Sequence, residues 1–198
     1  MALVVAFEGL SGSGKSTIIK KLIKTLHARG FRTAVTDMGT VRHARMLLPI
    51  AKKYPPRSRF RSLIYWALRI EQSEAIKKAE NVDIIFADRF WGSTMACDGY
   101  GNSAPLKIFE WIGESVECEP DITLFFKIPR EVARKRKDAK TLRDEEFARR
   151  TEKGYEELAE SKGWIRVDAS REPKEIEQFC LEIINEALVK KQKTKPRA

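Results

Sequence analysis

Residues 9–16 constrain the fold of this chain more than any other segment. Their sequence, Gly-Leu-Ser-Gly-Ser-Gly-Lys-Ser, fits the pattern G-x-x-x-x-G-K-[ST] at every position. An apolar run at residues 3–8 precedes the pattern, and an amphipathic stretch that ends near Gly30 follows it. This order predicts a strand, a loop whose backbone N–H groups point inward at phosphate oxygens, and a helix. The alternative is a glycine-rich turn that only caps an ordinary helix.

We expect this loop to bind ATP together with Mg²⁺. The positive end of the following helix adds to the attraction of the loop amides for phosphate. Lys15 can reach the β- and γ-phosphates, the Ser16 hydroxyl can bind Mg²⁺, and Thr17 is expected at the α-phosphate. The predicted ATP-binding residues are Gly9, Ser11, Gly12, Ser13, Gly14, Lys15, Ser16 and Thr17.

Five short apolar runs alternate with helical patterns along the chain. The runs cover residues 3–8, 32–37, 82–87, 122–128 and 164–167, and the helical patterns cover residues 15–29, 58–80, 143–161 and 173–190. Most of the runs lack polar alternation, as expected for strands covered on both faces. The fold class predicted is therefore α/β, a P-loop NTPase with a doubly wound, five-stranded parallel sheet and helices on both faces. Ligands of such sheets bind outside the carboxyl ends of the strands.

The chain shows no internal repeat and no linker, so we expect a single domain over residues 1–190 and a basic tail at 191–198. Its longest apolar runs fall short of the roughly 20 residues that cross a bilayer, and we expect no membrane association. The three cysteines, Cys97, Cys118 and Cys180, have no metal-binding spacing. Together with the lack of a signal sequence, they favour a cytoplasmic location.

Positive charge is concentrated in two segments. The net charge is +10; residues 41–70 hold eight Lys or Arg and no acid, and residues 190–198 hold five and no acid. Eight uncompensated cations in a folded segment favour a bound anion, so some of them are predicted to face phosphates. A solvated basic face is the alternative. The tail is interpreted as a frayed end, and no specific nucleic-acid binding is expected.

Acidic residues end two of the predicted strands. Asp88 follows the run at 82–87, where it is predicted to hold Mg²⁺, with Arg89 facing the reacting phosphates. The alternative is that Asp88 caps a helix and Arg89 is a surface charge. Glu8 ends the first strand and could orient magnesium-bound water, act as a base toward a hydroxyl, or anchor the loop. These roles of Glu8 stay open.

Several further motifs give the chain a resemblance to thymidylate kinases. They are residues 7–17, Leu68-Arg69, Asp88-Arg89-Phe90 with Ser93, and residues 96–99, 120–123 and 167–169, in the order of that family and over nearly the whole chain. The resemblance implies a nucleoside-monophosphate kinase that transfers the γ-phosphate of ATP to dTMP, giving dTDP and ADP. It also implies a homodimer that packs long helices together.

The resemblance assigns residues to the acceptor as well. Arg69 and Arg89 match arginines that hold the acceptor monophosphate, and paired guanidinium donors suit phosphate oxygens. Tyr65, one helical turn before Arg69, matches an aromatic that stacks on thymine, although helical spacing also fits a core aromatic. Ser93 is expected to contact the base or to support that loop. The predicted acceptor-binding residues are Glu8, Arg42, Arg45, Tyr65, Arg69, Arg89, Ser93 and Cys97.

The segment at about 130–145 resembles the lid of the family. Seven Lys or Arg lie within residues 130–143. In relatives without an arginine in the phosphate loop, a lid arginine stabilises the transition state, and the candidates here are Arg134, Arg136 and Arg143. They join Lys15, Asp88 and Arg89 as the predicted catalytic residues. A basic solvated helix is the alternative.

Three positions depart from the family on the acceptor side. Ser11 replaces an aspartate, and Cys97 replaces a tyrosine that packs against the sugar. Residues 37–40 replace an Arg-Glu-Pro-Gly-Gly run, so a phosphate-contacting arginine is missing, for which Arg42 or Arg45 is the substitute. We expect an intact ATP site with a relaxed acceptor pocket. The alternatives are a nucleotide-binding paralogue with little or no kinase activity and a deoxynucleoside kinase.

Overall fold

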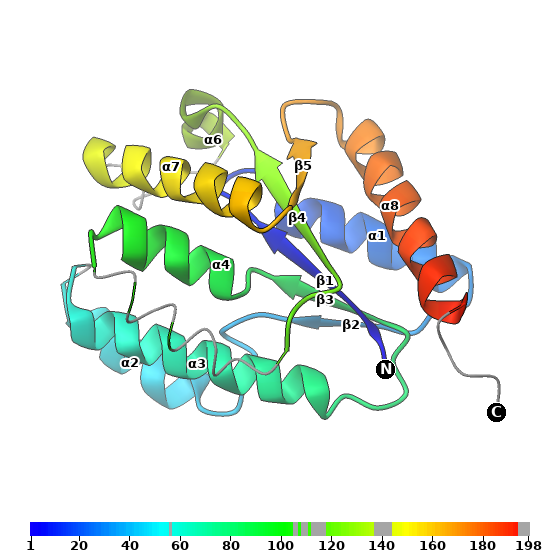
Figure 1. The fold of residues 1–198 in the computed structure, drawn as a ribbon, viewed down its shortest axis with the longest axis horizontal. Coiled ribbons are helices and arrows are strands. Elements are labelled where there is room, and N and C mark those ends of the chain that lie inside the picture. Colours follow the sequence, from blue (N-terminus) through cyan, green and yellow to red (C-terminus); the bar gives the residue numbers. More distant parts are fainter. Residues whose placement is uncertain (56, 105–106, 108–110, 112–117, 137–143, 194–198) are drawn as a thin grey trace.

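Five parallel strands form one sheet in the order β2-β3-β1-β4-β5 (Figure 1). The computed structural model describes residues 1–198 apart from 56, 105–106, 108–110, 112–117, 137–143 and 194–198. The central strand, β1, is buried along its whole length. The strands are β1 (Leu3–Glu8), β2 (Thr33–Thr36), β3 (Ile84–Asp88), β4 (Ile122–Lys127) and β5 (Ile165–Asp168). The predicted α/β fold with a five-stranded parallel sheet is confirmed, with strand ends that differ by at most two residues.

Aromatic side chains of three neighbouring strands form the centre of the core. Phe7 of β1 lies 5.7 Å from Phe86 of β3 in an edge-on arrangement, and 5.6 Å from Phe126 of β4, between ring centroids. All three side chains are fully buried. Each contributes about 1.5–3 kcal/mol through its removal from water. This packing fixes the middle of the sheet, from whose carboxyl edge the functional loops emerge.

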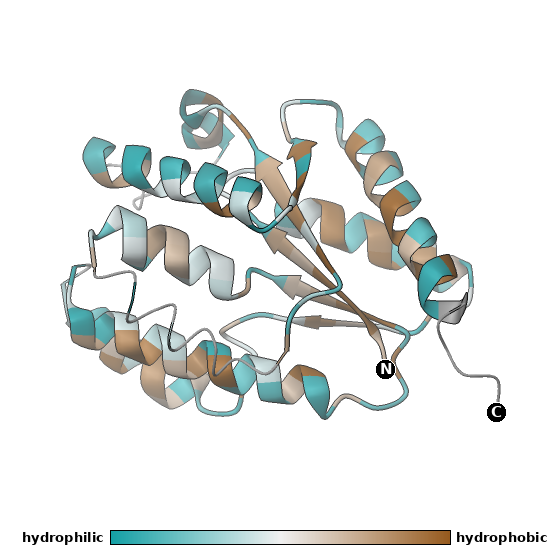
Figure 2. Cartoon of the chain, in the orientation of Figure 1, coloured by the Kyte–Doolittle hydropathy of each residue, from teal (hydrophilic) through white to brown (hydrophobic). Residues whose placement is uncertain are grey.

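Helices cover both faces of the sheet, as predicted. In Figure 1, α1 and α8 lie on one face, while α3, α4 and α7 lie on the other. Figure 2 shows mainly hydrophobic strands between helices in which hydrophobic and hydrophilic residues alternate. Among the described residues, no helix is both long and apolar enough to cross a membrane. Their bounds are α1 Lys15–Ala28, α3 Arg59–Lys77, α4 Trp91–Thr94, α7 Glu145–Ser161 and α8 Pro173–Lys193.

The last helix continues three residues beyond its predicted end. Lys191, which the sequence analysis placed in the basic tail, lies within α8 and donates to the Ala2 carbonyl at 2.7 Å. Its ammonium group also bonds both carboxylate oxygens of Asp121, at 2.9 and 2.7 Å. The chain end is therefore tied to the start of β1 and β4 through this lysine. Residues 194–198 of the predicted tail lie outside the described residues.

Among the described residues, α2 (Ala44–Lys53), α4, η1 (Met95–Gly101) and α6 (Arg130–Arg136) lie outside the helical patterns predicted from the sequence, although α6 agrees with the basic helix given as the alternative for the lid segment. Pro49 lies inside α2 and interrupts the pattern that would have indicated a helix. The segment η1 is π-helical and contains two glycines, which local propensity disfavours. It continues α4 and packs against α7, so tertiary contacts stabilise a helix that the local sequence does not specify.

Two glycines allow η1 and α7 to approach closely. A Cβ atom on Gly154 of α7 would lie 2.6 Å from the ring of Tyr100 in η1. A Cβ atom on Gly101 of η1 would lie 2.6 Å from the ring of Phe147 in α7 and would collide with the Thr151 hydroxyl. Side chains larger than glycine at either position would therefore push the two helices apart.

In Gly154→Ala the added methyl overpacks a filled interface, which we expect to cost about 1–3 kcal/mol. The gain of about 1 kcal/mol in helix propensity offsets part of this cost, so we expect a net loss of stability of up to about 2 kcal/mol. Urea unfolding followed by circular dichroism measures the difference. Lys153→Ala, at the neighbouring exposed position, is the control and should change stability by about 0.5 kcal/mol or less. An unfolding midpoint of Gly154→Ala equal to that of the wild type would contradict the close approach.

Candidate active site

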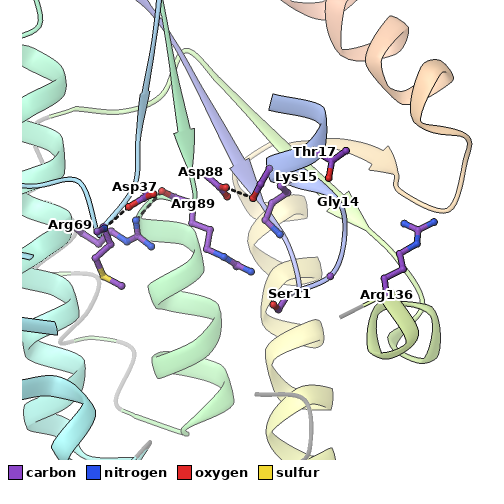
Figure 3. Close-up of a pocket in the computed structure, with 13 residues that line it drawn as sticks. Ser11, Gly14, Lys15, Thr17, Asp37, Arg69, Asp88, Arg89 and Arg136 are labelled. Atoms are coloured by element: carbon purple, nitrogen blue, oxygen red, sulfur yellow. Dashed lines mark hydrogen bonds between the residues drawn. The ribbon is translucent and has the colours of Figure 1, made fainter. Parts of the chain in front are cut away.

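A cavity of about 570 Å³ opens at the carboxyl ends of β1, β2 and β3. Figure 3 shows Ser11 and Lys15 of the phosphate loop between Arg69 and Asp37 on one side and Arg136 on the other. The loops after the first three strands meet there, as predicted for a sheet of this type. The described residues that line the cavity are Ser11, Gly12, Gly14, Lys15, Ser16, Thr17, Asp37, Met38, Gly39, Arg69, Asp88, Arg89 and Arg136.

The phosphate loop depends on glycine at positions where other residues do not fit. Gly9, Gly12 and Gly14 have φ angles of +132°, +88° and +89°. L-residues rarely adopt these angles, which here curl the backbone around the cavity. A Cβ atom on Gly9 would also lie 2.6 Å from the Phe126 carbonyl oxygen, and one on Gly12 would collide with the carbonyl of Ala133 in α6. The loop is therefore packed directly against β4 and the first helix of the predicted lid.

Lys15 curls back over this loop from the first turn of α1. Its ammonium group donates to the carbonyl oxygens of Gly9 at 3.0 Å and Leu10 at 2.8 Å, and to the Ser13 hydroxyl at 2.9 Å. The side chain is largely buried. These bonds hold a positive charge at the mouth of a loop that also offers backbone N–H groups and a helix N-terminus. The combination is suited to a polyphosphate.

Ser16 and Asp88 meet on the lining of the cavity. The Ser16 hydroxyl of α1 donates to the Asp88 carboxylate of β3 at 2.5 Å. Both are hard oxygen donors of the kind that Mg²⁺ prefers, and they approach from two elements beside the phosphate loop. The pair therefore fits a magnesium ion that is shared with bound phosphates.

Arg89 extends from the end of β3 toward the phosphate loop (Figure 3). Its φ of +71° lies in the left-handed region, which costs a non-glycine residue about 1–3 kcal/mol and is concentrated at functional sites. Its Nη1 donates to the Gly9 carbonyl at 2.7 Å, to the Ser93 hydroxyl at 3.0 Å and to the Tyr155 hydroxyl at 2.9 Å. Hydrogen bonds from Nη1 thus hold the Arg89 guanidinium in place at the edge of the cavity.

Arg69 of α3 binds the backbone of Arg89 and also lines the cavity. Its Nη1 donates to the Arg89 carbonyl at 2.9 Å and to Gln72 Oε1 at 2.7 Å, and its Nε donates to the Thr94 hydroxyl at 3.3 Å. The side chain is only 3% exposed. Burial lowers the pKa of this guanidinium, and the charge of Glu8 opposes that effect. Two linked arginines therefore line the cavity, and Arg89 donates to the same Gly9 carbonyl as Lys15.

Glu8 lies close to these arginines, 1% exposed, and is not among the described residues that line the cavity. Its carboxylate accepts the Phe90 N–H at 2.9 Å and a short bond from the Ser93 hydroxyl. Burial raises the pKa of Glu8, against the opposing effects of Ser93 and the charges of Arg69 and Arg89. This geometry supports the anchoring alternative, because Glu8 has no access to a substrate hydroxyl.

Other predicted acceptor residues lie away from the described lining of the cavity. Arg42 and Arg45 are exposed, before and within α2. Tyr65 is half-buried, with its hydroxyl accepting from Arg61 Nε at 2.9 Å and the Arg61 guanidinium 5.3 Å from its ring centroid. Cys97 is half-buried in η1, and burial raises the pKa of its thiol to about 11. Ser93, described above, is buried.

The predicted lid begins with α6, which carries two of the three candidate arginines. Arg134 is held in an ion pair with Glu145 of α7. Arg136 lies on the cavity wall and donates from Nη1 to the Ala169 carbonyl at 2.8 Å. Arg143, the third candidate, lies outside the described residues. The described geometry therefore favours Arg136 as the lid cation that faces a bound nucleotide.

Several residues of the site were not assigned a role from the sequence, although residues 37–40 were placed on the acceptor side. Asp37, Met38 and Gly39 line the cavity after β2, and their position was predictable because the carboxyl end of every strand faces the same edge. Gln72 and Tyr155 hold the arginines through buried hydrogen bonds. These two lie in helices far along the chain, and no local signal separates them from ordinary core residues.

The sheet order, the loop after β1 and the Ser16–Asp88 pair define a P-loop nucleotide-binding protein of the kinase type. The comparisons with known proteins identify the family. Residues 7–180 match the family described as thymidylate kinase, and the chain belongs to that family.

Relatives named thymidylate kinase align over most of their length. One from Prochlorococcus marinus strain MIT 9301 is 33% identical over 87% of this chain and 90% of its own. One from Halothermothrix orenii is 32% identical over 95% and 99% of the two chains. One from Synechococcus strain RCC307 is 27% identical over 93% and 96%.

If Arg136 is the lid residue that reaches bound nucleotide, Arg136→Ala should lower the rate of ATP consumption by about 10³-fold or more. Arg134→Ala should cost less than about tenfold, because Arg134 is engaged by Glu145. A coupled assay of ADP release measures both. A large loss in Arg143→Ala together with a small one in Arg136→Ala would overturn the assignment.

Proposed function

We propose that this protein transfers the γ-phosphoryl group of ATP to dTMP, giving dTDP and ADP, with Mg²⁺ bound by Ser16 and Asp88. The observation that carries the proposal is one cavity that is lined by the phosphate loop with Lys15 and also by Arg69 and Arg89. Membership of the thymidylate kinase family supports the identity of the acceptor. Several cations along one cavity allow two polyanions to approach each other.

Residues of the chain have separate tasks in this reaction. The loop amides and Lys15 hold the β- and γ-phosphates, while Arg89 and Arg69 orient the acceptor. An oxygen of the acceptor monophosphate attacks the γ-phosphorus, and the bond to the β–γ bridging oxygen breaks, so that ADP leaves with that electron pair. Magnesium, when bound, neutralises part of the phosphate charge. Arg136 adds positive charge from the lid, and closing the lid excludes water as a competing acceptor.

A phosphorylated acceptor suits the site better than a free nucleoside. A monophosphate oxygen is already anionic and needs positioning, whereas a 5′-hydroxyl needs a base. Glu8, the base expected for the deoxynucleoside kinase alternative, is buried behind Arg89 and bonded to Ser93. The carboxylates on the described cavity lining are Asp88, assigned to Mg²⁺, and Asp37.

A relaxed choice of acceptor belongs to the same proposal. Residues 37–39 stand on the cavity wall where the family has its Arg-Glu-Pro-Gly-Gly run, so a carboxylate replaces a cation there. Neither Arg42 nor Arg45 is among the described residues that line the cavity. Ser11 also lines the cavity, in place of the family aspartate. The contacts that select the acceptor therefore differ, while the ATP side keeps its full loop.

The acceptor profile tests this function. We expect ADP release with dTMP, and turnover of dUMP, dCMP or the ribonucleotide within about tenfold of it because the selecting contacts are altered. Thymidine should give no ADP above the no-acceptor background. Lys15→Ala is the matched control and should be inactive with every acceptor, whereas Lys20→Ala, exposed on the same helix, should be active. ADP release with thymidine alone would refute the kinase proposed here. The absence of ADP release with every one of these acceptors would refute it as well.

We also propose that the protein acts as a homodimer in the cytoplasm. Large apolar side chains are exposed along α2 and α3, among them Phe60 and Leu63, each 49% exposed, with Met46, Ile50 and Tyr54 nearby in the chain. Phe60 and Leu63 lie on the long helix α3, and Tyr54 packs against Phe60 with ring centroids 4.7 Å apart, so this exposed apolar face supports self-association.

Light scattering should therefore give about twice the chain mass of 22.7 kDa. Leu63→Asp should halve that mass, because it places a charge in an apolar contact. Phe179→Asp, at an apolar position of similar exposure on α8, is the control and should leave the dimer intact. A wild-type mass of one chain at micromolar concentration would show that the exposed face has another purpose.

A further inference from the structure

Tyr155 of α7 is completely buried, although its hydroxyl lies at the edge of the site. Its ring stacks on Phe125 of β4, with centroids 5.6 Å apart and an angle of 17° between the planes. The hydroxyl lies 2.9 Å from Arg89 Nη1 and 2.9 Å from the Ser93 hydroxyl. Tyr155 is not among the described residues that line the cavity, so its effect on a substrate must act through Arg89.

The protons of this cluster can be assigned by counting donors. The single proton of the Ser93 hydroxyl is donated to Glu8. The Ser93 oxygen is therefore an acceptor toward Tyr155, and the tyrosine donates its own proton to it. That leaves the lone pairs of the Tyr155 oxygen for Arg89 Nη1. Burial also raises the pKa of Tyr155, which keeps the hydroxyl neutral. Arg89 thus donates to Tyr155, Tyr155 donates to Ser93, and Ser93 donates to the Glu8 carboxylate.

These bonds leave most of the Arg89 guanidinium to face the cavity. All three oxygens that bind it, from Gly9, Ser93 and Tyr155, accept from Nη1, whose two protons serve three acceptors, so one N–H is shared. Within the part of the chain that the structure describes, Nε and Nη2 make no hydrogen bond, and Arg89 lines the cavity. Two free donors on one edge of a fixed guanidinium match the oxygens of a phosphate.

We propose that Tyr155 is a positioning residue that holds Arg89 so that its free edge meets the acceptor phosphate. The inference rests on the proposed function and names a residue that directs the acceptor side of the same site. A guanidinium held from behind by buried groups binds an anion with less loss of side-chain entropy than a mobile one. The left-handed backbone of Arg89 needs such support, because the side chain leaves the strand at an unfavourable φ.

The close contact of η1 and α7 sets the position of Tyr155. Gly154, the neighbouring residue, lies against the ring of Tyr100 with no room for a Cβ atom. We infer that the spacing of the two helices sets where α7 places the tyrosine hydroxyl relative to Arg89. The glycine contact between helices and the arginine in the site are therefore parts of one arrangement.

Tyr155→Phe removes the hydroxyl and keeps the ring on Phe125. We expect the dissociation constant for dTMP, measured by calorimetry without ATP, to rise about tenfold, as for loss of one hydrogen bond to a charged group. The KM for dTMP should rise similarly, with the KM for ATP unchanged within about twofold. In an Arg89→Lys background the substitution should have no further effect.

Thr151→Val is the matched control. Thr151 lies one helical turn before Tyr155 on the same buried face, and its hydroxyl has no hydrogen-bond partner among the described residues. This variant also removes a buried hydroxyl from α7, and dTMP binding should not change. Gly154→Ala is a second variant that keeps the tyrosine and moves the helix, and it should weaken dTMP binding in the same selective way.

The outcomes separate the inference from the function on which it rests. A Tyr155→Phe protein with unchanged dTMP affinity, or with dTMP and ATP affinities reduced alike, would overturn the positioning role. If the wild type binds dTMP without releasing ADP, the kinase proposal falls, and the binding constants still decide the role of Tyr155. If the wild type does not bind dTMP, both fall.

Discussion

The parallel pairing of β1 with β3 is the constraint on which the whole site depends. Its register places Phe7 opposite Asp88, so both strands end at the same level of the sheet. The Arg89 N–H extends this pairing to the Phe7 carbonyl at 3.1 Å. As a result, the Ser16 hydroxyl meets the Asp88 carboxylate, although the two residues are 72 positions apart in the sequence. A shift of one residue in this register would turn Asp88 to the other face of the sheet and separate the pair.

Electrostatics decide what the cavity can hold. Its described lining carries four cations, Lys15, Arg69, Arg89 and Arg136, against the carboxylates of Asp37 and Asp88. Such an excess is unfavourable without a ligand, because like charges in one cavity repel. Backbone carbonyls meet part of this cost: Gly9 accepts from both Lys15 and Arg89, and Ala169 accepts from Arg136. Bound phosphates would take over that task with full negative charges.

The sequence predicted those parts of the protein whose physical cause is local. Residues 9–16 specify their own loop because glycine alone permits its φ angles. The apolar runs specify strands covered on both faces, and the end of each strand locates a functional loop. Local signals failed where tertiary packing overrides them, as in η1, whose glycines serve a helix contact, and in α2, which forms despite Pro49.

What the sequence alone determined was thus the fold class, the phosphate loop and the positions of Asp88 and Arg89, because hydrophobic periodicity and backbone sterics act over a few residues. Only the tertiary structure decided which polar residues reach the cavity. It brought Asp37 and Arg136 to the lining, put Glu8 behind it, and left Arg42 on the surface. The physical reason is that access and hydrogen bonding depend on distances between residues far apart in the chain, which the packing of helices on the sheet fixes.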